Sequence, residues 1–115
     1  MLKPYLAVNF FVTSGGTEPV RKWLQSLAPH DRRAIGADIK TVQLGWPLGM
    51  PLVKKIADGL WEIRTHLHDR IARIFFTVIG QTVLLLHGFF KKSQATPAKD
   101  LALANARLKQ VRSAL

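Results

Sequence analysis

The sequence predicts an α+β fold, in which a small antiparallel sheet carries an N-terminal helical hairpin and a C-terminal helix. Apolar residues recur at helical spacing between residues 17 and 44, and again from residue 98 onward. Between these segments, from residue 60 to residue 87, runs of aromatic and β-branched residues are separated by short turns. A length of 115 residues suits one compact domain, so we expect residues 1–115 to fold together.

The N-terminal part is expected to contain one strand followed by two helices. Residues 5–13 are rich in aromatic and β-branched residues and end at a Ser-Gly-Gly turn, which is typical of a strand. Thr17 can cap a first helix and Pro19 fits its first turn, while apolar residues follow at positions i, i+3, i+4 and i+7. A second helix is expected after Pro29, because apolar residues again share one face up to residue 44. Two short consecutive helices predict the hairpin.

The second half is expected to form a three-stranded meander and a last helix. Residues 44–52 contain two glycines, two prolines and several apolar residues, and therefore predict an ordered loop. Three strands are expected at Leu60–Leu67, Arg70–Ile79 and Thr82–His87, joined by two-residue turns. Thr96-Pro97 provides a cap and a first-turn proline, so the last helix is expected to begin there.

The charge of the chain favours a polyanionic partner. Seventeen Lys and Arg residues stand against seven Asp and Glu residues, giving a formal net charge of +10. Such an excess suits nucleic acid, an anionic membrane or an acidic protein, although it can also be a solvated basic surface. The absence of cysteine excludes disulfides, thiolate zinc sites and cysteine nucleophiles, and favours a cytoplasmic location. The apolar segment 71–90 contains Arg73 and two turn residues, so we expect strands there and no membrane partner.

Side-chain alternation along the expected strands selects a candidate cationic site. Glu62, Arg64 and His66 share one face of their strand, opposite a largely apolar face. Arg73 lies in an otherwise apolar strand, where a cation needs water or a partner, and an ion pair with Glu62 is one way to satisfy it. The ends of a meander can approach one another, so the following lysines are expected to join the two arginines in one concavity: Lys54, Lys55, Lys91 and Lys92.

Aromatic and histidine residues add further candidates. We expect Phe89 to be buried and Phe90 to be exposed, where Phe90 could stack on an unpaired RNA base beside the lysines. His66 could act as a general acid or base, although an ordinary surface histidine is the more common outcome at such a position. His66 and His68 have no evident third ligand, so no metal site is expected. No glycine-rich nucleotide-binding motif and no serine-hydrolase motif occurs, so no cofactor is expected.

Three motifs carry a resemblance to a known family: LWEIR at residues 60–64, RIARIFF at residues 70–76 and LLLHGFFKKSQATP at residues 84–97. With them the sequence resembles the RelE/ParE superfamily of bacterial toxins, most closely the HigB-like, phage-associated branch. The resemblance implies a small ribonuclease that cuts messenger RNA on the ribosome and is inhibited by a helix-turn-helix antitoxin. On this chain it implies that Arg64, Arg73, Lys91 and Lys92 form the catalytic site. Lys54, Lys55 and His66 would then support that site.

The chemistry of metal-free RNA cleavage agrees with these residue types. A neighbouring 2′-hydroxyl attacks the phosphate, so the enzyme must align the phosphate, stabilise extra negative charge and move two protons. Arginine and lysine serve the first two tasks. Some family members use a C-terminal tyrosine or histidine for proton transfer, whereas the only tyrosine here is Tyr5 and Phe90 cannot exchange protons. His66, His87 or a lysine would then transfer the protons; alternatively, the chain is a non-catalytic protein that binds RNA or its antitoxin, or a ParE-like gyrase inhibitor.

Overall fold

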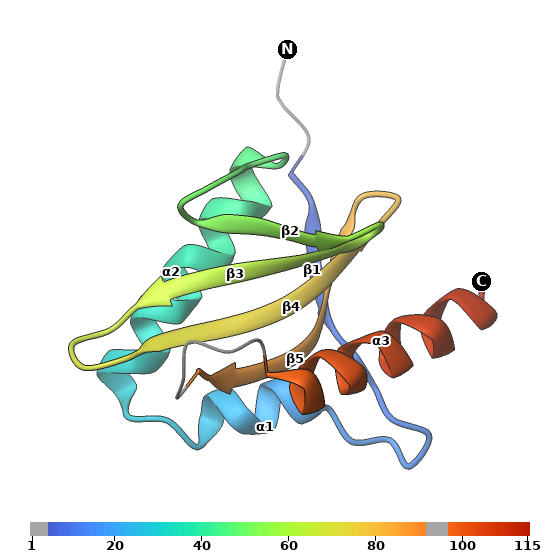
Figure 1. Cartoon of the computed structure of the whole chain (residues 1–115), viewed down its shortest axis with the longest axis horizontal. Helices are drawn as coiled ribbons and strands as arrows, with labels where there is room; N and C mark the ends of the chain where they lie inside the picture. Colours follow the sequence, from blue (N-terminus) through green and yellow to red (C-terminus); the bar gives the residue numbers. More distant parts are fainter. Residues whose placement is uncertain (1–4, 92–96) are drawn as a thin grey trace.

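A computed structural model describes residues 5–91 and 97–115 and confirms the α+β class. Five strands form one sheet in the order β1-β5-β4-β3-β2, with three helices packed on it (Figure 1). The elements, in chain order, are β1 (Ala7–Phe10), α1 (Pro19–Gln25), α2 (Pro29–Gly45), β2 (Val53–Ala57), β3 (Leu60–His66), β4 (Ile71–Ile79), β5 (Thr82–Phe90) and α3 (Ala98–Ser113).

The sheet is mixed, so the prediction of a wholly antiparallel sheet is wrong for its first strand. β1 pairs in parallel with β5, from Ala7 opposite Thr82 to Phe10 opposite Leu85. All other neighbouring strands are antiparallel. Parallel neighbours need a long connection, and here that connection consists of two helices and three strands. The pattern of residues in β1 shows its strand character but not the direction of its partner.

One strand was not predicted, and another extends further than predicted. β2 lies at the edge of the sheet and pairs with β3, although its sequence VKKIA lacks apolar alternation. Lysines are common on edge strands, where they face water and discourage pairing with another chain. β5 continues to Phe90, beyond the predicted end at His87. Because β2 spans Val53–Ala57, Lys54 and Lys55 belong to the sheet and not to a loop before it.

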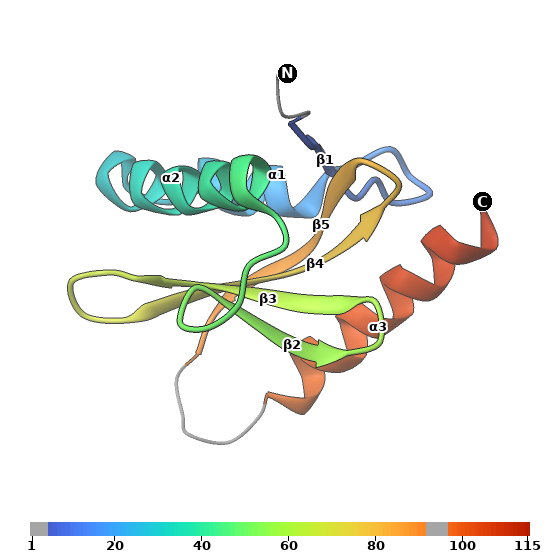
Figure 2. The same cartoon turned by 90° about the horizontal axis from the view of Figure 1, so that it is seen from above.

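The three helices cover both faces of the sheet. Figure 2 shows α1 and α2 over one face and α3 on the other. The expected hairpin of α1 and α2 is not the arrangement found, because α1 packs mainly on β5 and α2 mainly on β3. Their apolar stripes are buried against the sheet instead of against each other. The last helix is confirmed at Ala98–Ser113, while its predicted cap at Thr96 lies outside the described residues. No helix within the described ranges is long and apolar enough to cross a membrane.

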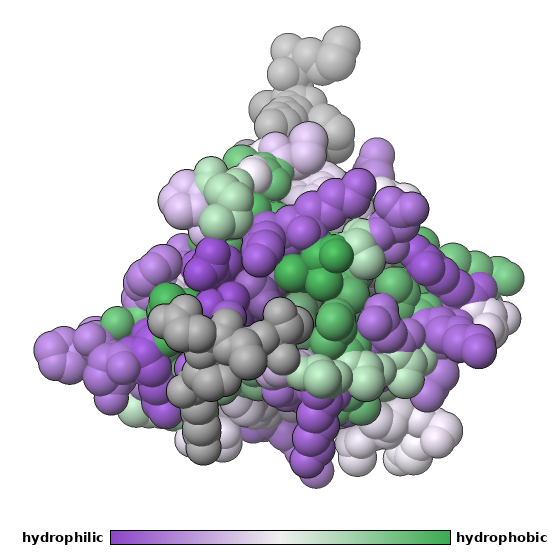
Figure 3. Space-filling model, viewed as in Figure 1, coloured by the Kyte–Doolittle hydropathy of each residue, from purple (hydrophilic) through white to green (hydrophobic). Residues whose placement is uncertain are grey.

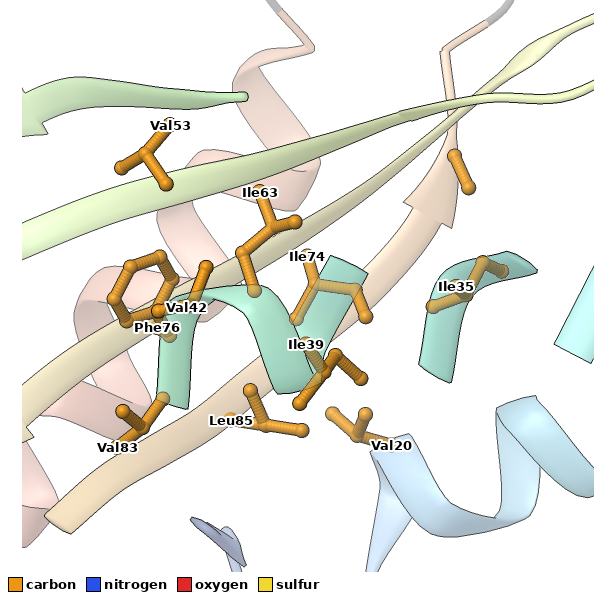
Figure 4. Close-up of a cluster of buried hydrophobic side chains, with 11 residues drawn as sticks. Val20, Ile35, Ile39, Val42, Val53, Ile63, Ile74, Phe76, Val83 and Leu85 are labelled. Carbon is orange, nitrogen blue, oxygen red and sulfur yellow. The ribbon is translucent and has the colours of Figure 1, made fainter. Parts of the chain in front are cut away.

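Two hydrophobic cores result, one on each side of the sheet. The core under α1 and α2 includes Ile74 and Phe76 of β4 (Figure 4). The core under α3 includes Phe75, which lies between them in sequence, and Phe89 of β5. Because alternate strand residues point to opposite faces, β4 must be apolar at almost every position. This explains its near-continuous apolar sequence and makes Arg73 the one charged residue in the strand.

Gly88 allows helix α1 to approach strand β5 closely. A Cβ atom at this position would lie 2.6 Å from Cζ3 of Trp23 and closer still to Cε3. The indole ring of Trp23 also packs against Phe90, with ring centroids 5.3 Å apart. The glycine of the LLLHGFF motif is therefore needed for packing between helix and sheet.

The substitution Gly88→Ala is expected to lower the free energy of unfolding by about 1–3 kcal/mol, because the added methyl group overpacks against Trp23. Chemical denaturation followed by tryptophan fluorescence measures this change. Gly36→Ala is the matched control, since it adds the same methyl group on α2 where no atom lies within 4 Å. It should raise the stability by about 0.8–1 kcal/mol, because alanine is the better helix former. Equal effects at the two positions would contradict the role assigned to Gly88.

Candidate functional site

A basic pocket lies between the β2 side of the sheet and the beginning of α3. It has a volume of about 240 Å³, and we call it the cation pocket. It combines four cationic side chains and one carboxylate with an apolar wall. Its lining residues are Lys54, Lys55, Ile56, Glu62, Arg73, Phe75, Lys91, Pro97 and Leu101. In Figure 3, which shows the face of the sheet that carries α3, hydrophilic residues gather over the strands beside the start of this helix.

An ion pair between Glu62 and Arg73 lies in the cation pocket. Nη1 of Arg73 donates a hydrogen bond to Oε1 of Glu62 at 2.8 Å, and the two side chains are only 8% and 4% exposed. The ion pair that the sequence left as one alternative is thus confirmed. It also brings a buried carboxylate into the pocket. The sequence singled out Glu62 only as a partner for Arg73 and gave no sign that it would line the site.

Strand register explains why Glu62 is needed. Arg64 of β3 lies directly opposite Arg73 of β4, and like charges in this arrangement repel. Glu62 precedes Arg64 by two residues and therefore points to the same face. Its Oε1 lies 3.9 Å from Nε of Arg64 as well as 2.8 Å from Nη1 of Arg73. One carboxylate therefore offsets the repulsion between two guanidinium groups.

The two arginines still have unused donors. Nε of Arg64 and Nε of Arg73 are buried, and neither has a hydrogen-bond partner within the described part of the chain. A buried donor without an acceptor costs about 1–3 kcal/mol, so such groups call for an explanation. A phosphate oxygen can accept from Nε and Nη2 of one guanidinium group together, in the bidentate geometry that arginine favours. The arrangement can therefore bind a phosphate group.

The other predicted site residues are distributed around this pocket. Arg64 and His66 line a neighbouring pocket of about 250 Å³, together with Asp38 of α2 and two residues of the preceding loop. His66 is exposed at the end of β3, and Arg64 lies between the two pockets through its position opposite Arg73. Lys92 lies outside the described residues. The structure therefore brings together Lys54, Lys55, Arg73 and Lys91, with Arg64 beside them.

Phe90 is half-buried, and the prediction that it is exposed is wrong. β5 continues to residue 90 and carries one extra residue, Leu86, opposite the step from Phe75 to Phe76, so its side chains alternate again from His87 onward. Phe89 lies opposite Arg73 and is buried as predicted, whereas Phe90 lies opposite Ala72 and faces the α1 side. The guanidinium carbon of Arg70 lies 3.6 Å from the centroid of the Phe90 ring. Phe90 is thus separated from the cation pocket by the sheet.

Contacts of α3 fix the wall of the pocket. Nε2 of His87 and Oδ1 of Asp100 are 2.6 Å apart, which ties β5 to the first turn of α3. Further along the helix, Nη1 of Arg107 donates to the carbonyl oxygen of Leu86 at 2.7 Å. Burial lowers the pKa of Arg107 from its usual value. His87 is therefore hydrogen-bonded to the helix and does not line the cation pocket.

The fold and the pocket define a small α+β protein with a mixed sheet and a basic site of about 240 Å³. The model of the family described as phage derived protein Gp49-like (DUF891) matches residues 22–109, which include every residue that lines the cation pocket. The chain therefore belongs to the Gp49-like, phage-derived family, a RelE-like family of toxin-type proteins. No curated protein matches the sequence.

The substitution Arg73→Ala is expected to lower the free energy of unfolding by about 3–5 kcal/mol, because it leaves the buried Glu62 carboxylate without its nearest partner. Urea denaturation measures the loss. Lys55→Ala is the control from the same pocket. The Lys55 side chain is 63% exposed, and its Nζ lies 3.7 Å from Oδ1 of the exposed Asp58. Its removal should therefore change the free energy of unfolding by less than about 0.5 kcal/mol. A similar small change for both variants would show that the ion pair does not stabilise the fold.

Proposed function

We propose that this chain is the toxin of a type II toxin–antitoxin system, in the HigB-like branch of the RelE superfamily. Its activity is the cleavage of messenger RNA on the ribosome by attack of a 2′-hydroxyl on the adjacent phosphate. The observation that carries the proposal is the cation pocket, where Nε of Arg73 has no hydrogen-bond partner among the described residues and three lysines share the lining. Membership in a toxin-type family supports the same conclusion.

The proposed roles follow from the chemistry of the side chains. Arg73 binds the scissile phosphate through its Nε and Nη2 edge, because Nη1 is already bonded to Glu62. Lys54, Lys55 and Lys91 stabilise the additional negative charge of the transition state. Each preorganised donor of this kind contributes on the order of 3 kcal/mol to transition-state stabilisation. Neither a metal ion nor an organic cofactor takes part in this reaction.

The remaining predicted residues support the site from its margins. Arg64 and His66 contact the RNA chain from the neighbouring pocket, on the same face of β3 as Glu62. Lys92 adds a further cation after Lys91, as the resemblance implies. Phe90 takes no part in base stacking, since it packs on Trp23 and Arg70 on the other side of the sheet.

The proposed partners are messenger RNA on the ribosome and a helix-turn-helix antitoxin, both acting in the cytoplasm. A formal charge of +10 favours both a polyanionic substrate and an inhibitor with an acidic contact surface. In the absence of antitoxin, the proposal requires growth arrest and new 5′ ends inside translated messages.

The double variant Lys54→Ala/Lys91→Ala tests the proposal without removing a buried group, since Lys54 is exposed and Lys91 half-buried. Controlled expression of the wild type should stop growth and produce translation-dependent cuts within codons, mapped by sequencing of 5′ ends. The double variant should cut at least about a hundredfold more slowly, because two transition-state donors are lost. Lys109→Ala, an exposed lysine of α3 away from the pocket, should behave as the wild type.

Two results would argue against cleavage, and a third would argue against a role of the cation pocket in it. Growth arrest with intact messages indicates a non-catalytic protein that binds RNA or antitoxin. Arrest with double-strand DNA breaks and inhibited gyrase indicates a ParE-like activity. Equal cutting by the wild type and the double variant would remove the cation pocket from the mechanism.

A further inference from the structure

We infer that Glu62 is the general base of the reaction, the group that removes the proton from the attacking 2′-hydroxyl. The inference rests on the proposed ribonuclease function and assigns the proton-transfer residue that neither the motifs nor the histidines supply. Glu62 is the only carboxylate that lines the cation pocket in the described part of the chain. Its position, its free oxygen and the elimination of other bases support the assignment.

The position of Glu62 is fixed relative to the phosphate site. Oε1 accepts from Nη1 of Arg73, while the phosphate is proposed to bind the Nε and Nη2 edge of the same planar guanidinium group. The carboxylate and the phosphate are therefore neighbours held by one rigid group. The 2′-hydroxyl lies on the nucleotide next to the scissile phosphate, within the region that the carboxylate can reach. A general base must have hydrogen-bond access to the proton that it removes, and this arrangement provides it.

Glu62 retains an oxygen for this task. Only Oε1 makes a hydrogen bond to the described residues, so Oε2 is available as an acceptor in the pocket that Glu62 lines. The charged groups around the carboxylate are Arg64 on β3, Arg73 on β4, Lys54 directly opposite on β2, and Lys91 after β5, while Lys55 lines the same pocket from the next position of β2. The wall contributed by α3 is apolar, with Pro97 and Leu101. Apart from Glu62 itself, the charged residues that line this pocket in the described part of the chain are thus all cations.

Other candidate bases lie elsewhere. His87 is hydrogen-bonded to Asp100, and its ring stacks on Phe89 with centroids 5.4 Å apart. His66 is exposed and lines the neighbouring pocket. Tyr5 precedes β1, on the opposite edge of the sheet from β2. Protonated lysines are donors only and serve as a base only after losing their charge. Glu62 remains as the acceptor beside the phosphate.

The step balances without a further reactant. Glu62 accepts the 2′-hydroxyl proton, the 2′ oxygen forms a bond to phosphorus, and the bond between phosphorus and the 5′ oxygen breaks. The departing 5′ oxygen takes a proton from solvent water, and Glu62 returns its proton to solvent. The products are a 2′,3′-cyclic phosphate and a 5′-hydroxyl end, with no change of oxidation state.

Glu62→Gln tests the assignment, because the amide oxygen still accepts from Arg73 but cannot remove a proton. With a defined messenger RNA on purified ribosomes, single-turnover cleavage should fall by about 10²-fold or more, the usual contribution of a general base. Ribosome binding should stay equal or become tighter, since a negative charge leaves the phosphate site. The wild-type rate should decline as pH falls, and this acidic limb should disappear in the variant. A residue that merely positions Arg73 would leave the acidic limb in place.

The outcomes separate the inference from the proposed function. Absence of cleavage by the wild type, with 2′-deoxy substitution at the cut site as a reference, overturns both. Cleavage by the wild type and by Glu62→Gln at comparable rates overturns the role of Glu62 alone. If circular dichroism shows that Glu62→Gln is unfolded, Glu62→Asp provides the test. It keeps the charge but withdraws the oxygen, and it should cut at least tenfold more slowly with an acidic limb retained. An unchanged rate for a folded Glu62→Asp would also overturn the assignment.

Discussion

Burial of β4 and β5 on both faces is the constraint on which the rest of the structure depends. α1 and α2 cover one side of these strands and α3 covers the other, so neighbouring residues such as Ile74 and Phe75 belong to different cores. A polar residue in such a strand has no water to bond on either side. Arg73 therefore requires a carboxylate on an adjacent strand, and Glu62 of β3 provides it. The buried ion pair thus follows from the position of Arg73 in an otherwise largely apolar strand.

The same packing decides where the site opens. α3 covers the sheet next to β5 but leaves space near β2, where the edge strand carries Lys54 and Lys55. Opposed arginines, buried Nε donors and clustered lysines all raise the free energy of the empty fold. An anion in the pocket would lower all three contributions, because it offsets the positive charges and accepts hydrogen bonds from the buried Nε groups. The proposed phosphate site thus coincides with the part of the protein where buried like charges and donors without acceptors lower its stability.

The helices and strands could be predicted from the sequence better than the way in which the strands pair. Helices α2 and α3 and strands β3 and β4 followed from periodicity, because amphipathic patterns report burial directly. The parallel pairing of β1 and the strand character of β2 did not, since direction and edge position are set by the whole sheet. In the site, charge and alternation found Arg73 and its lysines. They missed the face on which Phe90 lies, because that face depends on how far β5 extends and on the extra residue that the strand accommodates at Leu86. They treated Glu62 only as a partner of Arg73, because pocket geometry is absent from the sequence.

The close contact between Gly88 and Trp23 restricts the register of the last strand, β5. Gly88 lies against Trp23 on one face, while its neighbour Phe89 lies opposite Arg73 on the other, and Lys91 follows at the pocket. A shift of the chain by a single position would exchange the two faces and place side chains where the indole ring now lies. One extra residue is accommodated earlier in β5, opposite the step from Phe75 to Phe76. Beside Gly88 the register is fixed by Trp23, a side chain on the face of the sheet opposite the cation pocket.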